Sequence, residues 1–319
     1  MATPESFAPV AITRRSGCDE SVHFGAVVGV ASNGAVAFAI GDPTAAIYPR
    51  SSNKPMQAVA MARAGLQLSP ELLALVCASH DGTPMHVDAA RRILATVGLD
   101  ERSLANIADL PLDETAAHLV LRSGGGPTAL QMNCSGKHSG MLVTSAVNGW
   151  SLDAGYLAPD HPVQRQITAT IDDLVAEPHS HIGIDGCGAP AHMVSLLGLA
   201  RGFRSIATGD AGVAGDAVYR AMTSHPEMVG GKDRDVTKFM RGVAGLVAKD
   251  GADGVFAAAL PDGRAVAIKI ADGASRARPP VMVAALSALG IDTTVVESMV
   301  TQWILGHGAR VGEVRALAP

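Results

Sequence analysis

Aromatic residues are scarce in this sequence, and it contains no long run of basic residues. Phe, Trp and Tyr make up only 3% of the 319 residues, and 25 basic residues face 30 acidic ones, which gives a net charge of -5 at pH 7. Nucleic-acid-binding proteins use a basic stripe and stacking aromatic rings, and the sequence offers neither. We therefore expect no nucleic-acid partner and predict a small polar substrate.

Long apolar stretches are also missing. A membrane-spanning helix needs about 18 consecutive apolar residues, whereas the most apolar stretch, residues 25–41, is interrupted by Asn33-Gly34. The first residues, MATPESFAPVAITRRSG, have no basic start followed by an apolar run, unlike a secretory signal. We therefore predict a cytoplasmic protein with no membrane partner.

Cysteines are few: the chain has four, at positions 18, 77, 134 and 187. They lie far apart and form no CxxC pair. This spacing argues against a disulfide framework of the kind that stabilises small secreted domains. We expect reduced thiols or metal ligands instead.

Two turn signals mark hairpins near the two ends of the chain. Asn33-Gly34 separates the apolar runs 21–32 and 35–41, and this dipeptide is typical of a β-hairpin. Pro261-Asp262-Gly263 separates 254–260 from 264–270 in the same way. Between the hairpins, Pro and Gly at segment ends predict mainly helices. These lie near residues 69–77, 83–97, 160–176, 189–200, 211–223 and 235–243, with two more after Pro280 and a short strand at 181–184.

Strands near both ends with helices between them predict an α+β fold. In this fold an antiparallel sheet, built from both chain termini, carries helices on its faces and a helical region is inserted in the middle. We expect one domain over residues 1–319, with a terminal sheet region at about 1–50 and 245–319 and a central, mainly helical region at about 51–244.

The stretch Arg50-Ser51-Ser52-Asn53-Lys54-Pro55 places a serine and a lysine three positions apart where a helix is expected to begin. This spacing puts a hydroxyl and an amine on one helix face, where a neutral amine could take the hydroxyl proton. Desolvation or a second cation would lower the pKa of the lysine enough for this chemistry. A capping serine followed by an exposed lysine gives the same four-residue match.

Two further stretches concentrate polar residue types. CASHDG, residues 77–82, could hold a second hydroxyl, that of Ser79, near the first, although a helix end rich in capping groups is the simpler interpretation. NCSGKHSG, residues 133–140, allows a Cys-His nucleophilic pair, or equally a structural thiol before a helix. A phosphate-binding loop is excluded there, because Gln131 and His138 stand where that motif needs Gly and Ser or Thr.

GIDGCGAPA, residues 183–191, mimics a dinucleotide-binding fingerprint. The surrounding βαβ pattern is missing and Pro190 stiffens the loop, so Asp185 fits a ligand amine better, or simply serves the turn. Lys269 stands in an otherwise apolar strand. It either faces water or, if it faces the core, lies where it could perturb a neighbouring lysine.

Taken together, these stretches resemble the bacterial asparaginase family of the Rhizobium type. RSSNKP, CASHDG, NCSGKHSG, GIDGCGAP and the late Lys269 occur in family order and cover nearly the whole chain. The resemblance implies a fold similar to serine β-lactamases and glutaminases, which agrees with the terminal hairpins and inserted helices. One departure is Lys232-Asp233-Arg234-Asp235, where the family has an Arg-Phe-Asp-Thr-like run.

The activity implied by the resemblance is hydrolysis of L-asparagine to L-aspartate and ammonia with two Ser-Lys pairs. Ser51 with Lys54 matches the first pair, and Ser79 with Lys269 the second. Ser51 is then the expected nucleophile, Lys54 its base, and a covalent aspartyl-enzyme the expected intermediate. If Lys54 and Lys269 lie close together, each depresses the pKa of the other.

The resemblance also implies a zinc ion in a supporting role and a set of substrate contacts. Cys134, Lys137 and Cys187 match the zinc ligands, and a lysine must be neutral to bind a metal. The expected substrate-binding residues are Arg50, His138 and Asp185: Asp185 for the substrate amine, Arg50 for its carboxylate and His138 for the pocket wall. A homodimer is expected as well.

Two alternatives remain. One is a glutaminase or a β-lactamase-like acyl hydrolase, although the Lys-Thr-Gly motif of β-lactamases is absent. The other is a zinc-containing amino-acid-binding protein without turnover, against which the presence of all four Ser and Lys residues argues.

Overall fold

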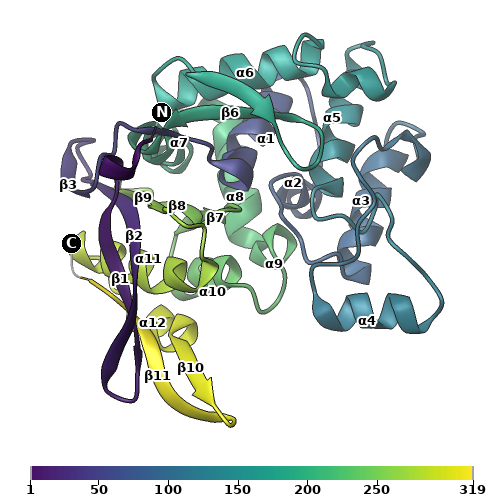
Figure 1. The fold of residues 1–319 in the computed structure, drawn as a ribbon. Coiled ribbons are helices and arrows are strands. Elements are labelled where there is room, and N and C mark those ends of the chain that lie inside the picture. Colours follow the sequence, from purple (N-terminus) through teal and green to yellow (C-terminus); the bar gives the residue numbers. More distant parts are fainter. Residues whose placement is uncertain (1, 318–319) are drawn as a thin grey trace.

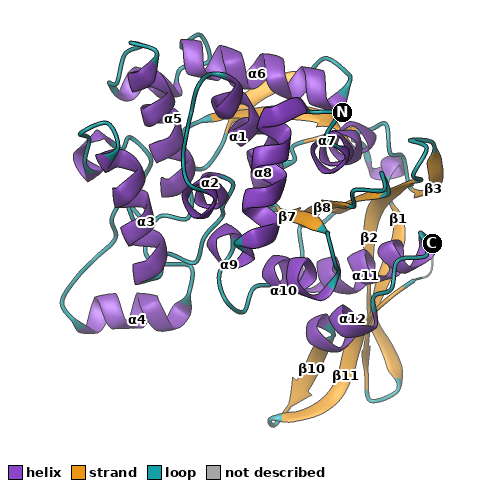
Figure 2. Ribbon diagram, turned by 180° about the vertical axis from the view of Figure 1, so that it is seen from behind, coloured by secondary structure: helices purple, strands orange, loops and turns teal. Residues whose placement is uncertain are grey.

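The computed structural model describes residues 2–317 and contains two antiparallel sheets surrounded by helices (Figures 1 and 2). The strands are β1 (Ala8–Arg15), β2 (Cys18–Val30), β3 (Val36–Ile40), β4 (Ala46–Ile47), β5 (His181–Ile184), β6 (Pro190–Ser195), β7 (Val247–Asp250), β8 (Val255–Ala259), β9 (Ala265–Ile270), β10 (Gln302–Gly306) and β11 (Ala309–Ala316). The larger, eight-stranded sheet has the order β10-β11-β1-β2-β9-β8-β7, with β3 also paired to β2. The smaller sheet has the order β4-β6-β5.

Helices make up most of the segment between the two halves of the larger sheet. They are α1 (Lys54–Arg63), α2 (Pro70–Val76), α3 (Pro84–Ala95), α4 (Glu114–Arg122), α5 (Ser135–Val147), α6 (Pro162–Val175), α7 (Leu196–Thr208), α8 (Gly212–Ser224), α9 (Pro226–Val229), α10 (Asp235–Gly242), α11 (Arg278–Ala288) and α12 (Thr294–Val300). Short 3-10 helices are η1 (Pro4–Ser6), η2 (Arg50–Asn53), η3 (Glu101–Ser103), η4 (Ala154–Leu157) and η5 (Ser275–Ala277). None of the helices in the described part of the chain has both the length and the apolar character needed to cross a bilayer.

The central strands of the larger sheet are covered on both faces. Every residue of β8 is buried, which a strand achieves only when elements pack on both of its sides. Helix α7 packs on β2, β8 and β9, while α11 packs on β1, β2, β9 and β11. In Figure 1, α7 lies above these strands and α11 below them. The sheet thus lies between helices. Strand β7 forms one edge of the sheet, and all of its residues are buried.

The predicted sheet from both chain ends is confirmed. Its strands lie within residues 8–40 and 247–316, and both predicted hairpins form, as β2 with β3 and as β8 with β9. The expected helices near 70, 84, 162, 212 and 235 are present as α2, α3, α6, α8 and α10. That the sheet region and the helical region form one domain stays a prediction.

One predicted helix is wrong over its first half. The expected helix at 189–200 is instead strand β6, and only then does α7 begin. Strand β6 pairs with β5 and β4, and Ser195 caps α7 by accepting a hydrogen bond from the backbone of Gly198. An N-cap serine with extended backbone separates strand from helix here, which apolar periodicity alone does not reveal.

The hairpin of β10 and β11 was not predicted from the sequence. The two predicted helices after Pro280 are present as α11 and α12, but β11 follows them and pairs with β1. This pairing joins Ala11 to Ala316 across almost the full length of the chain. Such a long-range contact has no local signature in the sequence.

Candidate active site

Ser51 lies at the start of the segment that leads into α1. It belongs to η2, directly before Lys54 begins that helix. The preceding Arg50 has φ 53°, in the left-handed region that non-glycine residues seldom adopt. Strain of this kind tends to occur where function requires a particular side-chain direction. Ser51 is half-buried and, with Ser79, lines a cavity of about 420 Å³.

The Lys54 amine lies in the interior and contacts Ser79. Its Nζ donates to the carbonyl of Ala78 at 2.6 Å, to Ser79 Oγ at 3.0 Å and to Cys134 Sγ at 3.0 Å. Lys54 is only 1% exposed. The backbone N–H of Lys54 donates to the carbonyl of Ser51, but no hydrogen bond among the described residues joins the Lys54 amine to the Ser51 hydroxyl. The structure thus connects the amine of the first motif to the serine of the second.

Ser79 is held by the chain that follows α2. Its backbone N–H donates to the carbonyl of Val229, and that of the next residue, His80, donates to Asn133. The loop after α2 is therefore fixed between α9 and the segment before α5. These two hydrogen bonds fix the position of Ser79 between segments that are more than 50 residues away in the sequence.

No hydrogen bond among the described residues joins Ser79 to Lys269, and the catalytic role of this pair stays a prediction. Lys269 Nζ donates to the carbonyls of Asp253 and Ile270, the latter at 2.9 Å. Burial, outweighing the nearby carboxylate of Asp253, lowers its pKa. A half-buried lysine on β9 reaches the neighbouring turn between β7 and β8 and satisfies its ammonium there, while Lys54 supplies the amine at Ser79.

A second fully buried lysine, Lys249, was missed from the sequence. It lies on β7 with 0% exposure, and its Nζ donates to the Asp250 carbonyl at 2.7 Å and to Asp250 Oδ1 at 2.6 Å. Burial, with a contribution from Lys54, lowers the pKa of Lys249 to about 8 although Asp250 opposes the shift. The signal that could have found it is a single lysine within the apolar stretch before Gly251, where a core-facing side chain is expected.

Arg50 and Asp185, predicted to bind the substrate, lie in contact with each other. Arg50 Nε donates to Asp185 Oδ1 at 2.9 Å, and Arg50 also pairs with the carboxylate of Asp253. Asp185 follows β5 directly, so the small sheet carries it to η2. The two side chains come together from positions 135 residues apart, and their roles in binding stay predictions.

The three predicted metal ligands also come together. Lys137 Nζ donates to Cys187 Sγ at 3.1 Å, and Cys134, whose thiol donates to Asn133 Oδ1 at 3.0 Å, packs in the same buried cluster as Cys187. The Cys134 contact and the Lys137 ammonium hold the pKa of Cys187 well below its usual range, despite its burial. The pKa of Cys134 is raised by the same contact and by burial. The cluster is thus a buried group of two sulfurs and one amine.

His138 borders this cluster. Its Nδ1 forms a 2.8 Å hydrogen bond with the Tyr156 hydroxyl, while its buried Nε2 has no hydrogen-bond partner among the described residues. Burial lowers the pKa of His138 to about 4, so the ring is neutral. The residues described include no group of three or more His, Cys, Asp or Glu placed to hold a metal. The predicted ligand set therefore depends on Lys137.

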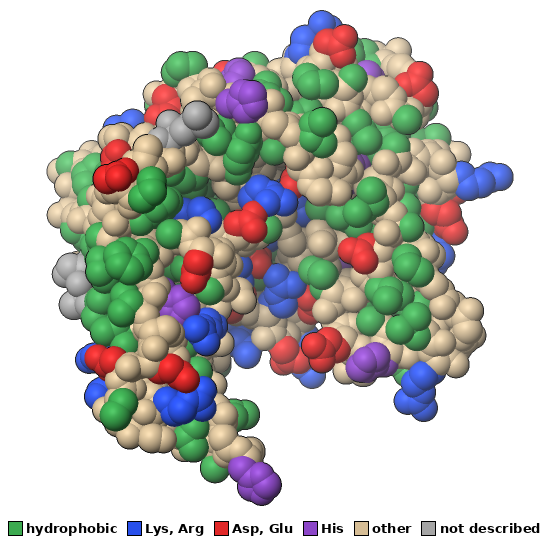
Figure 3. Space-filling model, in the orientation of Figure 1, with side chains coloured by type: hydrophobic (Ala, Val, Ile, Leu, Met, Phe, Trp, Pro, Cys, Tyr) green, Lys and Arg blue, Asp and Glu red, His purple; other side chains and the backbone are tan. Residues whose placement is uncertain are grey.

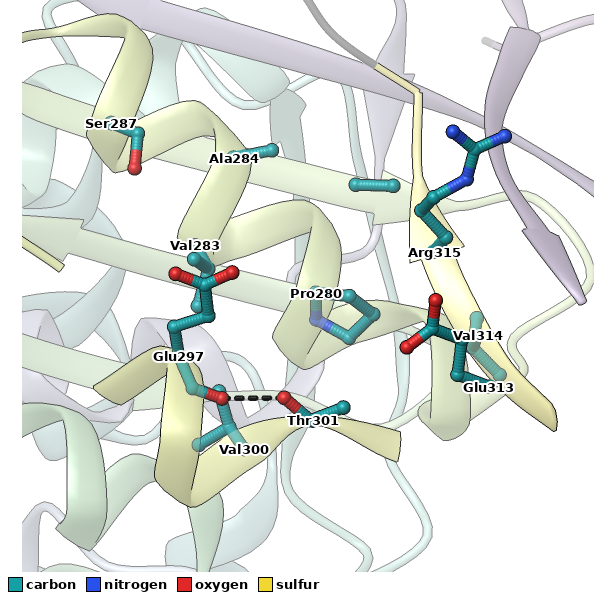
Figure 4. A pocket seen from close by; sticks show the side chains of 11 residues that line it. Pro280, Val283, Ala284, Ser287, Glu297, Val300, Thr301, Glu313, Val314 and Arg315 are labelled. Atoms are coloured by element: carbon teal, nitrogen blue, oxygen red, sulfur yellow. Dashed lines mark hydrogen bonds between the residues drawn. The ribbon is translucent and has the colours of Figure 1, made fainter. Parts of the chain in front are cut away.

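Charged side chains surround the site. In Figure 3, Lys, Arg, Asp and Glu gather around a hollow in the middle of the face shown. The cavity at Ser51 and Ser79 is also lined by Leu112, Asn133, Arg234, Asp250, Gly251, Ala252, Ser275 and Arg278. A separate cavity of about 360 Å³ lies between α11, α12 and β11 (Figure 4), and none of the predicted site residues lines it.

Comparisons with known proteins identify a family that matches nearly the whole chain. Residues 11–316 match the L-asparaginase II family. No curated protein sequence matches the chain. Among solved structures, "Crystal Structure Analysis of Mglu in its native form" is 13% identical with a TM-score of 0.45, covering 83% of this chain and 63% of that one.

A second structure, of native Mglu in the presence of 4.3M NaCl, is 12% identical with a TM-score of 0.39, covering 89% of this chain and 66% of that one. The chain thus spans less than two thirds of the length of the Mglu chains, and likenesses this distant carry no argument about function. The family match covers nearly all of the sequence and confirms the resemblance inferred from the motifs. The chain therefore belongs to the L-asparaginase II family.

Proposed function

We propose that the protein is an amidohydrolase that converts L-asparagine to L-aspartate and ammonia through a covalent acyl-enzyme. The observation that carries the proposal is the cavity shared by Ser51 and Ser79, with the buried Lys54 amine 3.0 Å from the Ser79 hydroxyl. A serine attacks an amide only when a base takes its proton, and an amine in a dry site can do so when neutral. Membership of the L-asparaginase II family supports the same substrate.

In the proposed reaction, Ser51 Oγ attacks the side-chain amide carbon of asparagine. The hydroxyl proton goes to an amine of the site, the C–N bond breaks, and the leaving nitrogen takes a proton and departs as ammonia. Water then attacks the aspartyl ester, which releases aspartate and restores the serine hydroxyl. Ser79, hydrogen-bonded to Lys54, passes protons between Lys54 and the reacting groups. Lys249, with its pKa of about 8, supplies a second amine that is partly neutral near pH 7.

Ser79 is the second candidate nucleophile, and one observation favours it. It is the serine whose hydroxyl contacts the Lys54 amine. Ser51 is preferred because it is the more exposed of the two and follows the strained backbone of Arg50. Both assignments give the same overall reaction, so single substitutions are needed to separate them.

The Arg50 and Asp185 pair is proposed to bind the charged end of the amino acid. An α-carboxylate placed at Arg50 and an α-amino group placed at Asp185 would each replace one half of the existing ion pair. The exchange keeps both side chains neutralised and therefore selects a zwitterion. His138, which is buried, is proposed to form part of the wall around the bound amino acid.

The donors at Cys134, Lys137 and Cys187 fit a zinc ion. Two cysteine sulfurs are ligands that zinc prefers, and the Lys137 amine, 3.1 Å from Cys187 Sγ, is the proposed third donor. When bound, zinc would supply a positive charge that holds the loops around 134 and 187 together. In the reaction itself these residues shape the pocket behind Lys54, whose amine contacts Cys134 Sγ.

The fold, assembly and location implied by the family resemblance belong to the same proposal. We propose a fold similar to serine β-lactamases and glutaminases, a single domain, a homodimer and a cytoplasmic location. The antiparallel sheet built from both chain ends, covered by α7 and α11, supports the first of these. Size-exclusion chromatography with light scattering tests the dimer.

The test has two parts: ammonia release is measured with asparagine and with glutamine, and turnover of a chromogenic β-lactam is followed by its colour change. The wild type should act on asparagine first. Ser51→Ala should abolish turnover with an unchanged circular dichroism spectrum, whereas Ser298→Ala, an exposed serine on α12, should behave as wild type. If Ser51→Ala kept full activity and Ser79→Ala lost it, Ser79 would be the nucleophile. Binding of asparagine without turnover would support the binding-protein alternative and overturn the proposal.

A further inference from the structure

Asp250 is a buried carboxylate enclosed by three cations from three parts of the chain. It is 3% exposed. Lys249 on β7 donates to its Oδ1 at 2.6 Å, Arg234 just before α10 donates to its Oδ2 at 2.6 Å, and Arg278 at the start of α11 lies 3.6 Å from Oδ2. Although burial alone would raise it, the pKa of Asp250 is held well below its usual range by these cations.

The two arginines each have a second anionic partner. Arg234 Nη1 donates to Asp81 Oδ1 at 3.1 Å, and Arg278 Nη2 donates to Asp235 Oδ2 at 2.7 Å. Lys249 contacts one carboxylate among the described residues, that of Asp250. The charge of Lys249 therefore depends on Asp250 more than the charges of the arginines do.

The groups that act on Lys249 come from four elements. They are Asp250 on its own strand, Lys54 at the start of α1, Arg234 before α10 and the Cys77 thiol after α2. Strand β8, which pairs along β7, is Val-Phe-Ala-Ala-Ala and has no titratable group. The remaining titratable residues on elements packed against β7 are half-buried or exposed, unlike Lys249: Arg50, Arg201, Arg204, Asp216, Tyr219, Arg220, Asp235, Lys238 and Arg241.

These contacts place two opposite influences on one amine. The Asp250 carboxylate favours the ammonium form of Lys249, while Arg234 and Lys54 favour the neutral amine. Lys249 and Asp250 are buried, so these charges are weakly screened and one substitution shifts the balance measurably. Burial has already brought the pKa of Lys249 to about 8, where such a shift changes the neutral fraction at working pH.

We propose that Asp250 is a positioning residue that holds the Lys249 amine and sets the pH at which it becomes neutral, with Arg234 acting on the same amine in the opposite direction. The inference rests on the proposed amide hydrolysis, in which Lys249 accepts or returns a proton. Asp250 affects the reaction only through Lys249. One of its carboxylate oxygens accepts a hydrogen bond from Lys249 and the other accepts one from Arg234.

The test is the pH dependence of kcat/KM for asparagine in the full-length protein. Asp250→Asn keeps the shape of the side chain and removes its charge, so the acidic limb should move down by roughly one pH unit or more. Arg234→Gln should move it up, and Arg234→Lys should restore the wild-type limb. Asp235→Asn, which removes the second partner of Arg278 without a contact to Lys249, should leave the limb in place.

A direct titration separates this inference from the proposed function. Lysine labelled with ¹³C at Cε, with the Lys249 signal assigned by its loss in Lys249→Met, reports the midpoint of Lys249 without turnover. The midpoint should fall in Asp250→Asn and rise in Arg234→Gln. If the wild type fails to hydrolyse asparagine while the midpoints shift in this way, only the function is overturned. Turnover with an unmoved midpoint in both variants overturns the inference alone, and Arg234→Gln decides it if Asp250→Asn does not fold.

Discussion

Lys54 donates a 3.0 Å hydrogen bond to the hydroxyl of Ser79, although the motif that contains Lys54 begins with Ser51. The spacing of three residues puts Ser51 and Lys54 on one side of the helical segment, but the long lysine side chain extends inward and ends 1% exposed among Ala78, Ser79 and Cys134. One amine therefore links Ser79 to the thiol cluster behind it, while Ser51 lines the same cavity as Ser79.

Replacing Lys54 by Met should reduce turnover by roughly a hundredfold or more, the scale of a lost proton-transfer group. Methionine has a similar volume and fills the buried space, so folding should survive. Ammonia release measures the effect. Lys269→Met is the matched control, because Lys269 contacts carbonyls elsewhere. An equal loss in Lys269→Met would restore the predicted role of Lys269.

Substituting Asp185 by Asn should raise KM for asparagine by about tenfold or more, the scale of a lost charge-assisted hydrogen bond. Because binding is affected more than chemistry, kcat should change less. Asp253→Asn serves as control, since Asp253 also pairs with Arg50 but is 60% exposed at its side chain. If KM rose more in Asp253→Asn than in Asp185→Asn, Asp253 would be the residue that binds the substrate amine.

Removing one sulfur of the thiol cluster should remove the metal. Purified wild type should carry about one zinc ion per chain by elemental analysis, the amount that one such site holds. Cys187→Ser should lose it, whereas Cys18→Ser, at an exposed cysteine, should keep it. Zinc retained in Cys187→Ser would contradict the proposed ligands, and a metal-free, active wild type would contradict the proposed cofactor.

Stability should fall in mild acid because buried histidines resist protonation. Burial lowers the pKa of His192 to about 4, below the value of about 6.5 expected in the unfolded chain. Its stabilising contribution is therefore complete above pH 6.5 and is lost as the pH falls towards 4, at about 1.4 kcal/mol per pH unit. Urea unfolding at pH 7.5 and 5 measures the loss.

His192→Gln should show a smaller loss between these two pH values, because its neutral side chain can still contact the Thr168 hydroxyl that His192 bonds at 2.8 Å. His118→Gln, at an exposed position on α4, should keep the wild-type dependence. The same pH dependence in both variants would show that His192 is not the cause.

Adding a methyl group at Gly136 should destabilise the protein. A Cβ there would stand 2.4 Å from the carbonyl oxygen of Leu75, so the backbones of α5 and α2 would have to separate. Overpacking of this kind costs about 1–3 kcal/mol, which thermal unfolding detects. Gly126→Ala, where nothing lies within 4 Å of an added Cβ, is the control, and equal melting temperatures would show that α5 shifts freely.

The sequence by itself determined what depends on neighbouring residues. Asn33-Gly34 and Pro261-Asp262-Gly263 specify hairpins because a turn needs only its own residues and the strands beside it. The order of the polar stretches was enough to identify the family. Cys134 and Lys137 are likewise close for a local reason, since Cys134 is the N-cap residue of α5 and Lys137 lies in its first turn.

Tertiary structure alone decided which of these groups meet. Whether Lys54 faces Ser51 or Ser79, and whether Lys249 or Lys269 is the buried lysine near it, depends on how α1, α2 and β7 pack. Both lysines at 249 and 269 sit in apolar strands, so local pattern treats them alike. The sheet order decides between them: β7 lies at the inner edge of the sheet beside η2, so Lys249 is withdrawn from water, whereas Lys269 reaches an exposed turn. Burial is what lowers the pKa of the Lys249 amine.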